Sequence, residues 1–110
     1  MSDTSAFKKR VLDFAGSREE KHFKDTLFQE ESLLLGINCL EPGQAQHVHS
    51  HDDQAKFYYV VEGRGWFTVD DDEFAAEVGE VVWAGAGVPH GVENRADGRL
   101  SLLMGIAPSP

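Results

Sequence analysis

Short apolar runs separated by turn residues are the feature that most constrains the fold of this chain. From about residue 21 onward, runs rich in β-branched and aromatic residues end at glycine, proline or aspartate clusters, at roughly ten-residue spacing. Such a pattern is typical of an all-β sandwich or barrel with many short strands. The strands that we expect span residues 23–29, 32–40, 57–62, 66–69, 74–78, 81–83, 90–94 and 100–106.

The first twenty residues have a different pattern. Residues 6–15 are predicted to form a short helix, because three apolar side chains recur there at helical spacing: Phe7, Val11 and Phe14. No other helical pattern follows. We therefore expect an N-terminal segment with a short helix over residues 1–20 and a β-barrel domain over residues 21–110.

Composition and charge exclude several classes of protein. The chain has 110 residues, one domain's worth, with 19 acidic and 10 basic residues and a net charge of −9. Residues 25–110 carry −11 of that charge, which repels phosphate backbones and argues against nucleic-acid binding. No apolar run approaches the roughly 18 residues of a membrane span, and the N-terminus lacks a secretory signal. With one cysteine, Cys39, the chain is expected to be cytoplasmic.

Histidines gather in one short stretch. His47, His49 and His51 alternate with other residues, so in an extended strand all three point to the same face. Neighbouring members of this row are about 6.6 Å apart and the outer two about 13 Å apart. Two of them can share one metal ion, whereas three cannot easily do so. The alternative is a polar strand face without any metal.

Glycines on either side of this stretch complete a recognisable pattern. Gly43 precedes His49 by six positions, His51 follows, and Gly63 comes seven positions after Lys56. This spacing resembles the first cupin motif, which has Glu at the position of Lys56. A later set of residues resembles the second cupin motif: Gly79, Gly85, Gly87, His90 and Asn94. That motif has Pro where this chain has Gly85. The chain is therefore similar to small bacterial single-domain cupins over about residues 23–107.

The resemblance implies a fold, a ligand set and an assembly. It implies a double-stranded β-helix, the jelly-roll cupin barrel, following a short N-terminal helix. It implies that His49, His51 and His90 hold a divalent transition metal (Fe, Mn, Zn or Ni), and that His47 lies outside the ligand set. It also implies a homodimer, formed by N-terminal strands and apolar outward faces.

Lys56 departs from the family pattern, because an ammonium group cannot bind a cation and its charge weakens a nearby metal site. Three arrangements are open. In one, Lys56 turns away to an acid such as Glu62 or Glu93 and leaves an open three-histidine site. In another, Gln54 or Asp53 supplies an oxygen ligand. In the third, the metal is absent and Lys56 and the histidines form a cationic pocket for an acidic small molecule.

Two functions compete at this stage. One is a metal-dependent enzyme acting on a small oxygenated or anionic metabolite, with dioxygenase- or isomerase-like chemistry at the three-histidine site. The other is a non-catalytic cupin that binds or senses a small ligand, with or without metal. In both, Lys56 and Tyr58 are the expected substrate-binding residues, because Tyr58 shares a strand face with Lys56 and Val60. No catalytic residue is assigned, and neither nucleic acid nor membrane is an expected partner.

Overall fold

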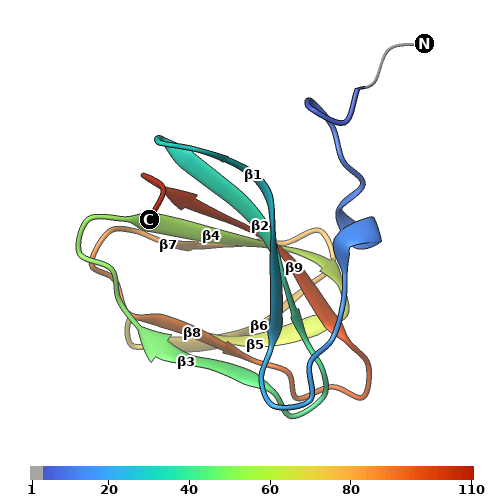
Figure 1. Cartoon of the computed structure of the whole chain (residues 1–110). Helices are drawn as coiled ribbons and strands as arrows, with labels where there is room; N and C mark the ends of the chain where they lie inside the picture. Colours follow the sequence, from blue (N-terminus) through green and yellow to red (C-terminus); the bar gives the residue numbers. More distant parts are fainter. Residues whose placement is uncertain (1–3) are drawn as a thin grey trace.

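Two antiparallel sheets contain all the strands of the computed structural model, which describes residues 4–110 (Figure 1). One sheet has the strand order β1-β2-β9-β4-β7 and the other β3-β8-β5-β6. The strands are β1 (Phe23–Glu30), β2 (Leu33–Leu40), β3 (Ala45–His49), β4 (Ala55–Glu62), β5 (Arg64–Val69), β6 (Asp72–Glu77), β7 (Val81–Ala84), β8 (His90–Glu93) and β9 (Leu100–Ala107). The prediction of an all-β jelly-roll fold with many short strands is confirmed.

The core lies between the two sheets. Side chains of both inner faces fill it, and those in the main cluster are Leu40, Tyr58, Val60, Phe67, Ala76, Val82, Val92, Leu100 and Leu102. On β4, alternation sends Lys56, Tyr58 and Val60 inward, while Tyr59 between them is 39% exposed. The strand pattern thus decides which chemical groups of β4 enter the barrel.

The turn after β4 needs a glycine for two reasons. Gly63 has a φ of +82°, a conformation that side chains with a Cβ rarely adopt. A Cβ on Gly63 would also collide with the backbone carbonyl of Arg99, just before β9. The last glycine of the first motif therefore fixes the β4–β5 connection against the neighbouring strand.

The N-terminal segment differs from the prediction. A helix over residues 6–15 is wrong: the structure has only a 3₁₀ helix, η1, at Val11–Phe14, and Phe7 is 86% exposed. No side chain caps the start of η1 at Arg10, and a helix this short does not repay its nucleation cost alone. Instead the segment runs extended beside β1 (Figure 1), where Lys9 Nζ donates to the carbonyl of Leu27 at 2.6 Å. None of the helical structure within residues 4–110 has the length and apolarity to cross a membrane.

Candidate metal centre

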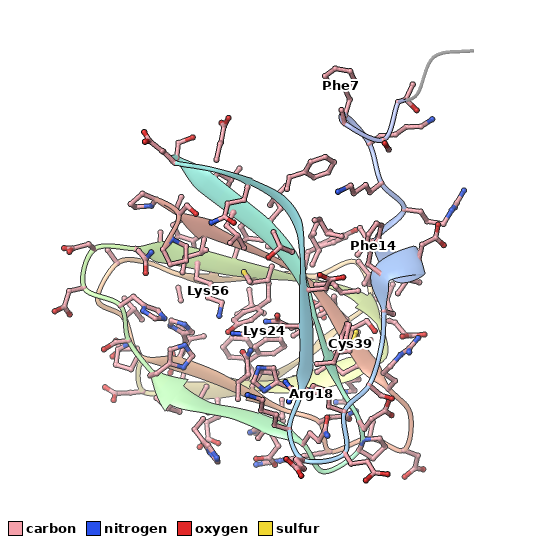
Figure 2. All side chains as sticks on the ribbon, in the orientation of Figure 1. Phe7, Phe14, Arg18, Lys24, Cys39 and Lys56 are labelled. Atoms are coloured by element: carbon pink, nitrogen blue, oxygen red, sulfur yellow. The ribbon has the colours of Figure 1, made fainter. Side chains whose placement is uncertain are left out.

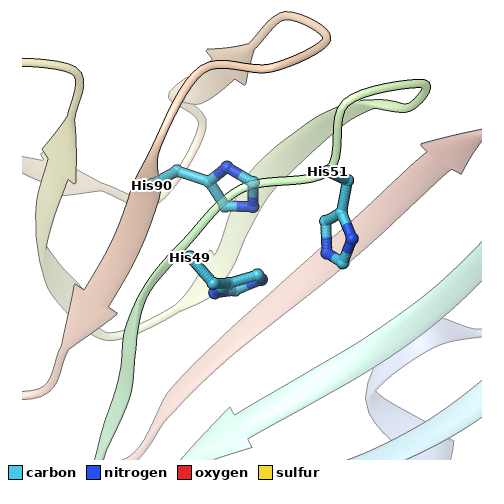
Figure 3. A group of neighbouring side chains, drawn as sticks. All are labelled: His49, His51 and His90. Carbon is cyan, nitrogen blue, oxygen red and sulfur yellow. The ribbon is translucent and has the colours of Figure 1, made fainter.

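Three histidines meet between the open ends of β3 and β8. His49 on β3 and His90 on β8 are direct cross-strand partners, and His51 follows β3 after a bend. Their ring centroids lie 4.5 Å apart for His49 and His90, 5.0 Å for His49 and His51, and 6.0 Å for His51 and His90. One nitrogen from each ring lies within 4.8 Å of the other two (Figure 3). The convergence expected for these three residues is thus present.

A β-bulge in β3 determines which histidines converge. Gln46 lies opposite Val92 and His49 opposite His90, so two β3 residues face the single residue Gly91. A Cβ on Gly91 would lie 2.9 Å from the Gln46 carbonyl oxygen, so only glycine fits beneath the bulge.

The expectation that His47, His49 and His51 share one strand face is therefore wrong. The bulge interrupts the alternation of side chains, and the two residues that it places opposite Gly91, His47 and Val48, are exposed. Of the two, His47 still borders the cavity described below, but it does not belong to the converging group.

Hydrogen bonds set the orientation of two of the rings. His49 Nδ1 donates to the carbonyl of His47 at 2.8 Å, and His90 Nδ1 donates to the carbonyl of Val88 at 2.9 Å. A proton held on Nδ1 leaves the Nε2 lone pair free for a metal, an arrangement that metal-bound histidines commonly use. His90 is 2% exposed, and among the described residues its Nε2 has no hydrogen-bond partner.

Electrostatics favour neutral rings at this site. Burial lowers the pKa of His90, and the carbonyl of Val88 opposes that effect. Burial also lowers the pKa of His51, with smaller contributions from His49 and Lys56. Neutral imidazole is the form that binds metal ions.

The three nitrogens fit a transition metal. Two ligands at about 2.1 Å from one ion are at most about 4.2 Å apart, so small ring rotations bring these nitrogens to bonding distance. His49, His51 and His90 would hold such an ion, and a buried, unpaired Nε2 on His90 is the observation that best fits one. Three imidazole ligands leave coordination positions free.

A cavity of about 510 Å³ opens beside the histidines. Its wall includes His49 and His51 from one side and Lys56 from the other, and Lys56 lies between the sheets (Figure 2). Lys56 is 6% exposed, with its Nζ 4.8 Å from the centre of the Tyr58 ring. Burial, and to a smaller extent Lys24, lowers the pKa of Lys56 to about 8.

The structure argues against two of the three arrangements considered for Lys56. Pairing with Glu62 or Glu93 is wrong, since Glu62 binds Arg99 at 2.8 Å and Glu93 binds Arg95. Gln54 instead donates to the carbonyl of Pro108, and neither Gln54 nor Asp53 lines the cavity. Lys56 thus shares the cavity with the histidines, as in the third arrangement, although the histidines also keep a metal-binding geometry.

Tyr58 lies deeper than expected for a residue that touches substrate. Its side chain is 1% exposed and is not part of the cavity wall. Burial raises its pKa, and its hydroxyl donates to Gln46 Oε1 at 2.9 Å. Gln46 Nε2 in turn donates to His22 Nε2 at 3.1 Å. Tyr58 therefore lies behind the cavity wall and holds one of its residues, Gln46, by a hydrogen bond.

Sequence reasoning missed most of the polar cavity wall, including Lys24, Asn38 and Gln46. Asn38 was detectable in principle, because it is the one polar side chain in an otherwise apolar strand at 33–40. Lys24 and Gln46 carry no comparable signal, since exposed-looking polar residues are common on strands.

Comparisons with known proteins agree with this geometry. The profile of the cupin domain family matches residues 36–106. The crystal structure of TT1209 from Thermus thermophilus has 38% identity and a TM-score of 0.90, over 94% of this chain and 98% of that one. A double-stranded β-helix protein from Klebsiella pneumoniae shares the fold, with a TM-score of 0.87 and 16% identity, over 93% and 90% of the two chains.

Two curated proteins are also similar. The oxalate-binding protein of Thermotoga maritima is 28% identical over 101 residues, which is 88% of this chain and 84% of that protein. The uncharacterized protein MJ1618 of Methanocaldococcus jannaschii is 31% identical over 61 residues, 56% of this chain and only 49% of its own length. Together with the profile match and the double-stranded β-helix fold, these similarities show that the chain belongs to the cupin domain family.

Proposed function

We propose that this cupin binds a divalent transition metal through His49, His51 and His90 and acts there on a small anionic, oxygen-rich metabolite. The observation that carries the proposal is the convergence of three imidazoles, one nitrogen each within 4.8 Å, at a cavity of about 510 Å³. A bound ion would act as a Lewis acid and offer open positions to a substrate oxygen, as dioxygenase- or isomerase-like chemistry requires.

Charge supports an anionic substrate. Neutral imidazoles leave the full charge on a divalent ion, and the cavity wall adds the amines of Lys24 and Lys56 against the carboxylate of Asp25. The cavity is thus a positively charged region in a chain whose net charge is −9. A local field of this kind concentrates small anions over other metabolites.

The test compares two histidine variants of the same strand region. Elemental analysis of the purified protein comes first, and competition titrations with Mn²⁺ or Zn²⁺ follow on metal-stripped protein. His51→Ala is expected to lower the affinity for the metal at least about tenfold, because it removes a ligand. Even the loss of a residue that only hydrogen-bonds to a metal ligand commonly costs that much. His47→Ala is the matched control and should leave affinity unchanged, since His47 lies outside the converging group and the substitution keeps the backbone carbonyl that accepts from His49.

Equal losses in His47→Ala and His51→Ala would contradict the proposed ligand set. A wild-type protein that binds neither Mn²⁺ nor Zn²⁺ nor Fe²⁺ would contradict the metal itself.

The second candidate is a non-catalytic ligand-binding cupin. It is favoured by the similarity, at 28% identity, to a protein of Thermotoga maritima described as oxalate-binding. One experiment distinguishes the two candidate functions: the iron-loaded protein is mixed with candidate acids, and oxygen uptake, product formation and binding are measured. Oxygen uptake or product formation supports the enzyme, whereas saturable binding with neither supports the binding protein.

A further inference from the structure

Asn38 is a buried polar residue whose hydrogen bonds remain unmade. Its side chain is 1% exposed, yet within residues 4–110 neither Oδ1 nor Nδ2 has a hydrogen-bond partner. Buried amides are nearly always paired, and leaving one unpaired destabilises the fold. A carboxamide in this position therefore calls for an explanation outside packing.

The register of the sheet shows where Asn38 points. Asn38 lies directly opposite Leu102 of β9 on one side and Lys24 of β1 on the other, and Leu102 lies opposite Val60 of β4. Residues directly opposite one another share a face, and Val60 and Leu102 belong to the core cluster between the sheets. Asn38 is thus directed inward, and it lines the cavity that the histidines border.

Two amines line the same cavity as this carboxamide from the five-stranded sheet. Lys24 is its direct cross-strand neighbour, and Lys56 on β4 lines the same cavity (Figure 2). The one carboxylate side chain of the cavity wall, Asp25, already accepts a hydrogen bond from the backbone of Thr26. His49 and His90 belong to the opposite, four-stranded sheet, so the amines and the histidines face each other across the cavity.

We propose that Asn38, Lys24 and Lys56 form an anion subsite opposite the three histidines, and that the ligand is a short dicarboxylate held at both ends. This inference rests on the proposed function for one end of the ligand, which the histidine-bound metal takes. At the other end the two amines supply charge, and Asn38 Nδ2 donates to a carboxylate oxygen. Binding would satisfy the donor of the unpaired amide.

The experiment is calorimetric titration of the Mn²⁺-loaded protein with oxalate, malonate, succinate and glutarate, and with acetate as the one-ended probe. One length in the series is expected to bind at least tenfold more tightly than acetate. Asn38→Leu, which keeps the branched shape of the side chain but removes its polar atoms, and Lys24→Gln, at an exposed position, should each reduce that dicarboxylate affinity at least tenfold. Both should reduce acetate binding much less than dicarboxylate binding, because acetate reaches only the metal end, and Lys8→Gln is the charge-matched control outside the cavity.

Thermal unfolding separates this role from a structural one. If Asn38 serves the ligand, Asn38→Leu should unfold at the same or a higher temperature than the wild type, because it removes an unpaired buried amide. If that variant fails to fold, Lys24→Gln carries the test alone. Dicarboxylates that bind no better than acetate, or a Lys24→Gln variant with wild-type dicarboxylate affinity, would overturn the subsite.

Titrations with and without metal distinguish a failure of the anion subsite from a failure of the proposed metal site. If the protein holds no metal but its malonate or succinate affinity still falls in Asn38→Leu and Lys24→Gln, the subsite stands and the metal site does not. If Mn²⁺ binds normally and both variants keep wild-type dicarboxylate affinity, the metal site stands and the subsite does not.

Discussion

Lys56 places a charged amine inside the barrel without a carboxylate partner among the described residues. The charged and titratable groups around the cavity include Lys24, Asp25, His22, His49 and His51. Burial is the main reason that the pKa of Lys56 falls to about 8. A lowered lysine pKa means that folding disfavours the ammonium form. The folded protein therefore bears a cost at neutral pH that the unfolded chain does not.

Lys56→Met is expected to stabilise the fold at pH 7. The shift from 10.5 to about 8 corresponds to roughly 3 kcal/mol, since each pKa unit is worth about 1.4 kcal/mol. Between pH 8 and 10.5 the unfolded wild type binds more protons than the folded form, so wild-type stability rises with pH. The advantage of Lys56→Met should thus shrink across that window, as measured by urea unfolding at several pH values.

Lys8→Met is the control for this measurement, since Lys8 is exposed and lies outside the barrel. A Lys56→Met variant that is less stable than the wild type at pH 7 would contradict an unpaired, buried ammonium. It would indicate that the amine makes an attractive contact stronger than its desolvation.

The sequence predicted some of these residue positions and not others. Convergence of His49, His51 and His90 followed from the resemblance to the cupin motifs, whereas the direction of Lys56 stayed open among three arrangements until the structure placed it between the sheets. Asn38 could not be placed in the same way, because both faces of the strand at 33–40 are mostly apolar and do not reveal which one meets a cavity. The depth of Tyr58 depends on the packing of both sheets into one core cluster, which no local pattern records.

At the scale of elements, the pairing of β3 with β8 shapes the histidine cluster. The bulge leaves His47 and Val48 exposed and brings His49 opposite His90. Strand alternation alone predicted a different arrangement, because a bulge depends on the partner strand some forty residues later and not on local sequence. The prediction of an N-terminal helix was wrong for a related reason. The apolar spacing of residues 6–15 is helical, but contacts with β1 stabilise the segment more than a short isolated helix would.

Gly91→Ala is expected to weaken metal binding by displacing the bulge that positions His49. The added Cβ would lie within 3.1 Å of three backbone atoms of the bulge, so β3 must move away from β8. That shift separates His49 from His90 and should lower Mn²⁺ affinity at least about tenfold, because outer support of ligands is worth 10–100-fold. The measurement is the same competition titration that tests His51→Ala.

Gly98→Ala is the matched control, since nothing lies within 4 Å of a Cβ at that position. Gly91→Ala should also lower stability, by about 1–3 kcal/mol for an overpacked site. If Gly91→Ala binds Mn²⁺ as tightly as Gly98→Ala, the bulge does not position the histidines.

At the scale of the whole molecule, one outer face is incompletely covered. The N-terminal segment lies over the β1 side of the five-stranded sheet, where Lys9 Nζ sits 4.7 Å from the centre of the Phe28 ring. At the other edge, β4 and β7 present cross-strand pairs of apolar side chains to the outside. Val81 and Trp83 are each 63% exposed and Tyr59 is 39% exposed. A contiguous apolar strip of this kind is typical of a protein interface.

We propose that two copies of the chain pair through this strip of Tyr59, Val81 and Trp83. Sedimentation velocity should then give about twice the chain mass of 12.2 kDa for the wild type. Trp83→Glu should weaken the dimer at least about thirtyfold, since a central tryptophan is commonly worth ~2 kcal/mol or more. Val48→Glu, an equally charged change at an exposed valine on the other sheet, should leave the dimer intact.

Salt dependence distinguishes an apolar interface from an ionic one. Each chain carries a net charge of −9, so bringing two together costs repulsion that salt screens over about 8 Å at physiological ionic strength. An interface built on the β4–β7 strip should therefore tighten as salt rises from low to physiological concentration, whereas one built on ion pairs should loosen. A wild-type monomer at all salt concentrations, or a Trp83→Glu variant that remains dimeric, would show that this face is not where two chains meet.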